Sequence, residues 1–186
     1  SLSIGYEKFH ELLEGARNMD LHFRNNEFSE NIPVLMACLS LWYNNFFNYQ
    51  THAIIPYSEN LKSFSKYLQQ ASMESNGKQT DRSENLVDYE TGQIIWGQTG
   101  TNAQHSFFQL LHQGSKVIPS DFIGFNNSIK GNKVHHDILM ANFFAQTKAL
   151  MKGTKGEEVN TNHKLFKGDR PTNTILISKL TPASLG

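Results

Sequence analysis

The sequence predicts an α/β fold in which helices cover both faces of a parallel sheet, giving a three-layer αβα sandwich. Two observations predict it. Short, wholly apolar runs, typical of buried parallel strands, recur along the chain. Segments with helical periodicity separate these runs, as strand–helix–strand units require. The chain has 186 residues, enough for one good-sized core, so we expect a single domain.

The first third of the chain predicts three helices and one strand. Apolar residues at helical spacing indicate a short helix over residues 9–16. A longer helix is expected over 33–47, with Pro33 at its first position. Its residues are apolar nearly all round, so much of it should be buried. A strand follows at 53–57, and a third helix presents an apolar face over 61–71.

The middle of the chain begins with a polar, turn-rich segment over 72–93. The short apolar run 94–96 predicts a buried strand. The helix after it is expected to begin with a capping-box pair, Thr101 and Gln104, and to end before Gly114.

The last third repeats the pattern of strand, helix and strand. The run 122–125 predicts another buried strand, and apolar positions over 138–150 indicate a helix that Gly153 ends. A long polar loop then leads to a final strand over 174–180. Short apolar strands that alternate with helices favour a parallel sheet over an antiparallel one.

Composition excludes several classes of function. Lys and Arg balance Asp and Glu at 17 each, so nothing suggests electrostatic attraction to nucleic acid. No run is apolar enough to span a membrane. The single cysteine, Cys38, lies in an apolar run, which favours a buried, inert thiol and a reducing compartment. His135 and His136 are adjacent and have no spaced partners, so no metal site is expected.

His105 is the first candidate for chemistry. In open α/β sheets, ligands bind beyond the carboxyl ends of strands, which points to the segment 96–108. His105 is about 200° around the helix from Ala103, so it should face away from the core in the first turn. The positive end of a helix disfavours imidazolium, and a neutral imidazole could transfer a proton. An exposed histidine with no role fits the pattern equally well.

Glu74 is the second candidate, at the junction between the third helix and a polar turn. A carboxylate held there could serve as a general base. Composition alone favours an ordinary surface glutamate. Gln70 lies four residues earlier, so Gln70 and Glu74 could face one ligand. A lone glutamine of this kind is also usually a surface residue.

Several segments, in order and over nearly the whole chain, resemble the glucose-6-phosphate isomerase family, its bacterial branch most of all. Residues 69–78 are similar to the family's QQG-x-MESNGK segment, and residues 97–105 to its GEPGTNGQH segment. The other matching segments are 41–47, 109–116, 118–122, 142–147 and 168–173.

The resemblance implies an enzyme that interconverts glucose 6-phosphate and fructose 6-phosphate through a cis-enediol, in the cytoplasm, with no metal or organic cofactor. By motif, Glu74 is the base that moves a proton between C1 and C2. His105 assists ring opening and reaches the site from the partner subunit of a homodimer. Gln70 matches a residue close to the bound sugar. A carboxylate and a neutral imidazole are suitable groups for this chemistry.

The resemblance also implies a place in a longer enzyme. Residues 1–186 match the second of two sugar isomerase domains of flavodoxin-like, doubly wound architecture, incomplete at both ends. Gln98, Thr99 and Ala103 depart from the usual Glu, Pro and Gly. The family's segment with a catalytic arginine would lie before residue 1, and its segment with a catalytic lysine would lie after residue 186. The isolated chain is therefore expected to lack isomerase activity.

Two other functions stay open at this stage. A sugar isomerase domain could bind sugar phosphates as a sensor without catalysis, although retention of Glu74 and His105 argues against this. The chain could also be a folding unit with no function of its own. It should then expose apolar surface that other parts of an assembly cover.

Overall fold

The computed structural model describes residues 3–154 and 161–186, and it confirms the predicted α/β class. The strands are β1 (Thr51–Pro56), β2 (Ile94–Gly97), β3 (Ser120–Asn127) and β4 (Thr172–Lys179). The α-helices are α1 (Tyr6–Asn25), α2 (Ile32–Phe46), α3 (Phe64–Leu68), α4 (Gly100–Gln104), α5 (Phe108–Gln113), α6 (Lys133–Lys152) and α7 (Pro182–Leu185). The short helical turns are η1 (Phe28–Glu30), η2 (Glu59–Leu61), η3 (Gln69–Glu74) and η4 (Asn162–Lys164).

The four strands form one parallel sheet in the order β2-β1-β3-β4. The strand order reverses between β1 and β3, so β1 and β3 flank the topological switch point. Flavodoxin-like folds show this same order and switch point. The predicted doubly wound topology is therefore correct.

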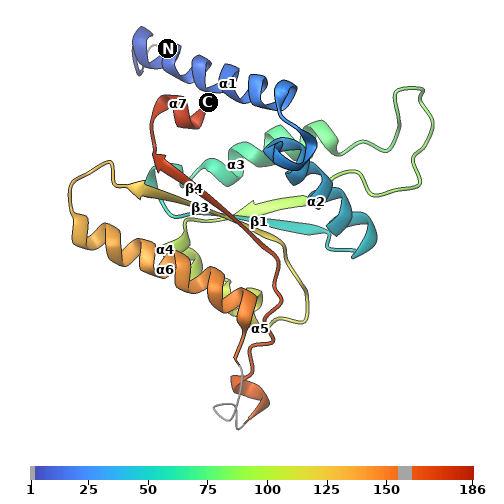
Figure 1. Ribbon diagram of the computed structural model, residues 1–186. Coiled ribbons are helices and arrows are strands. Elements are labelled where there is room, and N and C mark those ends of the chain that lie inside the picture. The colour runs from blue at the N-terminus through green and yellow to red at the C-terminus, as the bar shows by residue number, and fades with distance from the viewer. Residues whose placement is uncertain (1–2, 155–160) are drawn as a thin grey trace.

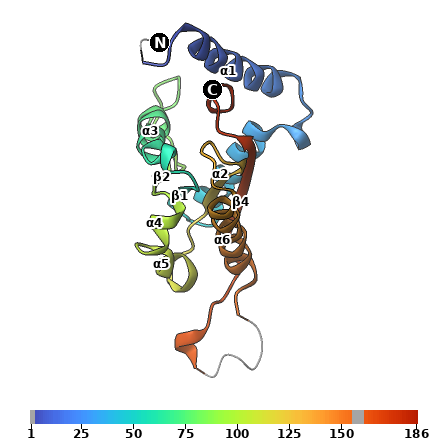
Figure 2. The same cartoon turned by 90° about the vertical axis from the view of Figure 1, so that its left-hand side faces the viewer.

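Successive residues of the two central strands, β1 and β3, point to opposite faces of the sheet and contribute to two separate hydrophobic cores. One core holds Ala53, Ile55 and Phe122 and is covered by α4, α5 and α6. The other core holds Ile54 and Ile123. It lies on the opposite face of the sheet, where α3 packs against it and α2 lies on the same side. Helices α1 and α7 pack against each other beyond this second layer, as both views show (Figures 1 and 2). The sandwich thus has helices on each side of one sheet.

A row of polar side chains crosses the sheet under α2. Nε2 of His52 in β1 lies 2.9 Å from Oδ2 of Asp121 in β3. Asn173 in β4 donates a hydrogen bond of 2.8 Å to the other carboxylate oxygen. Both His52 and Asp121 are buried. The row links three adjacent strands. The hydrogen bond from Asn173 satisfies one oxygen of the buried carboxylate, whereas Nε2 of His52 is close to the other oxygen but makes no hydrogen bond.

Two expectations for the α2 segment were wrong. The helix itself lies where predicted, but Asn44 is its only buried residue. Large apolar side chains such as Trp42 and Phe46 are exposed, at 51% and 79%. The thiol of Cys38 is exposed too, not buried. Periodicity shows that a face is apolar, but it does not show what covers that face.

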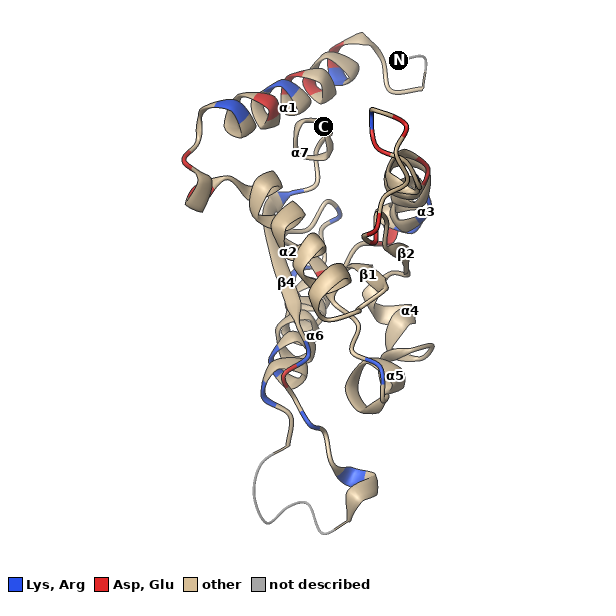
Figure 3. Cartoon of the chain, turned by 90° about the vertical axis from the view of Figure 1, so that its right-hand side faces the viewer, with Lys and Arg blue, Asp and Glu red and all other residues tan. Residues whose placement is uncertain are grey.

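Charged residues of both signs are interspersed along α1, as Figure 3 shows. This distribution agrees with the balanced composition of 17 basic and 17 acidic residues. No helix in the described part of the chain is both long and apolar enough to cross a membrane.

Candidate active site

The turn η3 is anchored to the free edge of β2 by side chains. Gln69 donates a hydrogen bond of 2.9 Å to the carbonyl oxygen of Ile95, and the Ile95 N–H donates to the sulfur of Met73 at 3.4 Å. One turn earlier, Ser65 donates to the carbonyl oxygen of Gly97 at 3.1 Å. Backbone groups that an edge strand leaves without a strand partner are thereby satisfied, and η3 is fixed relative to the sheet.

Gln70 and Glu74 lie on the outer side of this anchored turn. The turn is π-helical from Gln69 to Glu74, a conformation found mainly as single turns and frequently at functional sites. Gln70 and Glu74 are both exposed, while Met73 between them faces the sheet. Lys78 donates from its ammonium group to the backbone carbonyl oxygen of Glu74, which fixes the end of the turn. The sequence predicted the segment but not its π-helical backbone.

Two glycines set the path of the loop between β2 and α4. Gly97 has φ +148°, and a Cβ there would lie 2.0 Å from the carbonyl oxygen of Ile54. At Gly100 a Cβ would clash with the ring of Tyr57. Thr99 has φ −56° and ψ 140°, values that proline also adopts. Threonine at position 99 is therefore compatible with a backbone conformation that proline would also adopt.

The helix predicted after this loop is interrupted, and its predicted start was wrong. Helix α4 begins at Gly100 with Thr99 as N-cap, and Thr99 makes no side-chain cap hydrogen bond. The expected capping-box pair of Thr101 and Gln104 does not form, because both residues lie inside α4. The chain leaves helical geometry at His105 and Phe107, and a separate helix, α5, then ends before Gly114 as predicted.

His105 is therefore at the end of α4 and not in its first turn. Its side chain is exposed while Ala103 is fully buried, so the predicted outward orientation is correct. The sequence argument placed His105 at the positive end of a helix dipole, which would disfavour imidazolium. That argument was wrong, because His105 follows the last turn of α4 and therefore lies at the negative end of its dipole. An exposed imidazole at a break between two helices can still reach a ligand or a neighbouring molecule.

The structure does not bring Glu74 and His105 together within one chain. Met73, next to Glu74, packs against the core on the α3 face of the sheet. Ala103 and Phe107, on either side of His105, pack against the core on the opposite face. Neither Glu74, His105 nor Gln70 lines any of five well-formed cavities in the described residues. Gln70 and Glu74 share one turn, and His105 stands apart from both.

Tyr57 and Gln104 are buried polar residues that sequence patterns did not single out. Tyr57 is 3% exposed, and burial raises the pKa of its hydroxyl to about 12, with the Gln104 amide acting in the opposite direction. The hydroxyls of Tyr57 and Thr99 and the side-chain nitrogen of Gln104 are all buried and make no hydrogen bond in this arrangement. The glycine at position 100, which leaves room for the Tyr57 ring, is the sequence signal that could have located this cluster.

The candidate site offers acid–base groups and no cluster of metal ligands. In residues 3–154 and 161–186, no group of three or more His, Cys, Asp or Glu side chains is placed to hold a metal ion. The chemistry within reach of these residues is proton transfer by a carboxylate and an imidazole.

Comparison with known proteins identifies the family. Residues 1–186 match the family model described as phosphoglucose isomerase. Glucose-6-phosphate isomerase of Christiangramia forsetii is 55% identical over 100% of this chain, and that of Nitrosospira multiformis is 52% identical over 100%. The chain spans 37% and 36% of those two proteins.

Solved structures agree with this result. A glucose-6-phosphate isomerase from Chlamydia trachomatis superposes with a TM-score of 0.92 and 41% identity, over 97% of this chain and 36% of that one. A hypothetical protein from Thermus thermophilus, at 18% identity and a TM-score of 0.69, shares the fold over 94% of this chain and 40% of its own. The match of the family model to every residue, with relatives above 50% identity, shows that the chain belongs to the phosphoglucose isomerase family.

Proposed function

We propose that these residues form the second sugar isomerase domain of a cytoplasmic glucose-6-phosphate isomerase. The reaction interconverts glucose 6-phosphate and fructose 6-phosphate, a step shared by glycolysis and gluconeogenesis. The carboxylate of Glu74 takes a proton from C2 of the open-chain aldose and returns it to C1 through the cis-enediol, and the reverse direction uses the same group. Gln70, one turn away, hydrogen-bonds the sugar and holds it for this transfer.

The position of Glu74 carries the proposal. A general base must be held within hydrogen-bond distance of the proton that it moves. A glutamate on a freely moving surface segment would not be held in this way. Glu74 ends a π-helical turn that Gln69 and Met73 attach to β2 and that Lys78 caps. This turn fixes the backbone of Glu74 while its side chain remains free to meet a substrate.

The direct test is Glu74→Gln in a chain of the relatives' full length that contains these residues. The amide keeps the shape and removes the base, so kcat should fall by about 10²- to 10⁴-fold with little change in KM. Proton exchange at C2 of the sugar, followed by NMR in deuterated water, should stop as well. Glu84→Gln is the matched control: it removes the same charge from the same polar segment and should leave the rate unchanged.

If Glu74→Gln retained full activity, the base assignment would be wrong and a sugar-phosphate sensor would explain the fold better. The same variant with normal KM and lost kcat would exclude a sensor, because a sensor needs no proton transfer.

We further propose a homodimer in which His105 of one subunit assists ring opening at the Glu74 site of the other. The location of the two residues on opposite faces of the sheet supports this pairing. Mixing Glu74→Gln subunits with His105→Ala subunits tests it. In a mixed dimer one site has both variant residues and the other has neither, so about a quarter of the normal activity should return. If both residues served one site within a subunit, every site would lack one group and the mixture would stay inactive.

A further inference from the structure

The polar loop between η3 and β2 comes back to the sheet through residues 90–93, here called the return segment. None of these residues has an apolar side chain, so hydrophobic burial does not hold the segment in place. Hydrogen bonds hold it instead. Gln93 is 7% exposed, and both groups of its amide are paired: Ser40 in α2 donates to Oε1 at 2.7 Å, and Nε2 donates to the carbonyl oxygen of Tyr49 at 2.9 Å.

Asn45, in the last turn of α2, holds the other end of the return segment. Its Oδ1 accepts a hydrogen bond of 2.9 Å from the Glu90 N–H, and its Nδ2 donates one of 3.1 Å to the Glu90 carbonyl oxygen. The side-chain amide therefore pairs with both backbone groups of one residue, as a neighbouring strand does. Asn45 and Gln93 together fasten the two ends of the return segment to α2 and the residues that follow it.

The return segment contacts the residues that follow Glu74. A Cβ at Gly92 would lie 3.5 Å from the carbonyl group of Asn76 and from the nitrogen of Gly77, which is van der Waals distance. Gly77 in turn fits tightly against η3: its N–H donates to the Met73 carbonyl oxygen at 2.9 Å, and a Cβ there would lie 2.5 Å from that oxygen. Residues 76–77 therefore touch both η3 and the return segment.

We propose that Gln93 and Asn45 are positioning residues for the base at Glu74. This inference rests on the proposed function of Glu74 and adds to it the support that holds the base in place. The side chains of Gln69 and Met73 fix the start of η3 to β2, whereas Glu74 is the last residue of the turn. The backbone after Glu74 is supported by the return segment, and a displacement of about 1 Å is enough to slow a reaction strongly.

Amide hydrogen exchange in the 186-residue chain tests the physical link without any turnover. Asn45→Leu and Gln93→Leu each remove two hydrogen bonds from the return segment. The Gly77 amide should then exchange about tenfold faster, because its bond to Met73 opens more often. The increase at Gly77 should exceed that at the Ala53 amide in β1, which opens only with the sheet.

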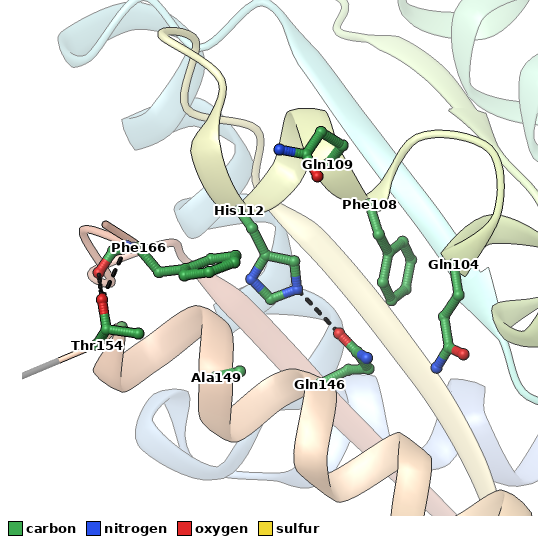
Figure 4. A pocket seen from close by; sticks show the side chains of 9 residues that line it. Gln104, Phe108, Gln109, His112, Gln146, Ala149, Thr154 and Phe166 are labelled. Carbon is green, nitrogen blue, oxygen red and sulfur yellow. Dashed lines mark hydrogen bonds between the residues drawn. The ribbon is translucent and has the colours of Figure 1, made fainter. Parts of the chain in front are cut away.

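Gln146→Leu is the matched control for hydrogen exchange. It removes the 2.9 Å hydrogen bond between Gln146 and His112, which joins α6 to α5 beside the cavity that Figure 4 shows. The variant loses a side-chain link of the same kind on the opposite face of the sheet. Its stability should fall, but Gly77 should exchange no faster than Ala53 does.

Kinetics in a chain of the relatives' full length test the consequence for the base. Asn45→Leu and Gln93→Leu should each lower kcat about tenfold with little change in KM, because the base is misplaced while the sugar still binds. Neither change should lower kcat further in a Glu74→Gln background, since both act through Glu74. Asn31→Ala is the control: it removes the N-cap of α2 and the bond to the Phe23 carbonyl oxygen, and it should leave kcat unchanged.

Asn45 is exposed, so Asn45→Leu keeps the test decisive if Gln93→Leu does not fold. Normal kcat in Asn45→Leu, or Gly77 exchange no faster than in the unaltered chain, would overturn the positioning role and leave Glu74 as the base. A further tenfold loss in the Glu74→Gln background would also overturn it. Full activity of Glu74→Gln is a different failure, because it removes the base itself and with it any residue that positions it.

Discussion

Individual residues show most clearly what a sequence pattern can and cannot establish. The pattern correctly predicted that the His105 side chain points away from the core. The buried residue Ala103 shows which side of the turn faces the core, and His105 lies on the other side. The pattern placed His105 in the wrong turn, because the break at His105 and Phe107 depends on how Phe107 and Phe108 enter the core. Glu74 looked like a surface residue from composition, and it is exposed. Its proposed role as a base rests on the family motif and on the turn that holds it.

Tyr57 leads to a prediction about alkaline pH. Its ring packs against Phe122 and Phe143, and burial raises its pKa from 10.0 to about 12. The unfolded chain loses this proton near pH 10 and the folded chain only near pH 12. The stability that the neutral hydroxyl contributes is therefore complete below pH 10 and is lost as the pH rises from 10 to 12.

Urea unfolding across that range checks the prediction. The free energy of unfolding should fall more steeply between pH 10 and 12 in the unaltered chain than in Tyr57→Phe, which has no proton to lose there. Equal slopes in the two proteins would show that Tyr57 ionises at an ordinary pKa.

Secondary-structure elements were predicted well where local pattern decides them. The four apolar runs are strands β1 to β4, and Gly153 ends α6 with φ +61°. The π-helical form of η3 was not predictable, because it is accompanied by long-range hydrogen bonds with β2, one donated by the Gln69 side chain and one accepted by the Met73 sulfur. A π turn bonds residue i to i+5 where an α turn bonds i to i+4, but a single turn is too short for hydrophobic periodicity to reveal this difference.

The adjacent glutamines of η3 should have different roles: Gln69 should contribute to stability, and Gln70 should contribute to substrate binding. Gln69→Leu leaves the Ile95 carbonyl without its partner and should lower the free energy of unfolding by about 1–2 kcal/mol. Gln70→Leu changes an exposed side chain and should leave stability unchanged while raising KM for glucose 6-phosphate in the full-length context. Urea unfolding and steady-state kinetics on both variants separate the two effects. Similar stability losses in both variants would contradict the assignment.

At the scale of the whole molecule, the prominent feature is apolar surface on α1 and α2. Leu41, Trp42 and Phe46 are each at least half exposed, and α1 buries none of its residues. Monomeric proteins rarely expose such surface over a wide area. The chain spans about a third of its relatives' length, so the two helices have only part of a family member to pack against.

The 186-residue chain should therefore self-associate and show no isomerase turnover. Static light scattering should give a mass that rises with concentration, and the double variant Trp42→Gln, Phe46→Ser should reduce that rise. A coupled assay should detect no fructose 6-phosphate formation, because Glu74 and His105 lie on opposite faces of the sheet and neither lines any of the five cavities described above. A concentration-independent monomer, or turnover near that of full-length relatives, would refute this view.

The side chains that satisfy the edge of β2 have a consequence for how the protein is made. Synthesis proceeds from the N-terminus, so Ser65, Gln69 and Met73 leave the ribosome before β2 does. A nascent β1–β2 unit can thus have its outer edge occupied as soon as it forms. Only the β1 edge then remains open, and that is where β3 must add. The newly made chain exposes one pairing edge at a time, which restricts the order of strand addition and limits pairing with other nascent chains.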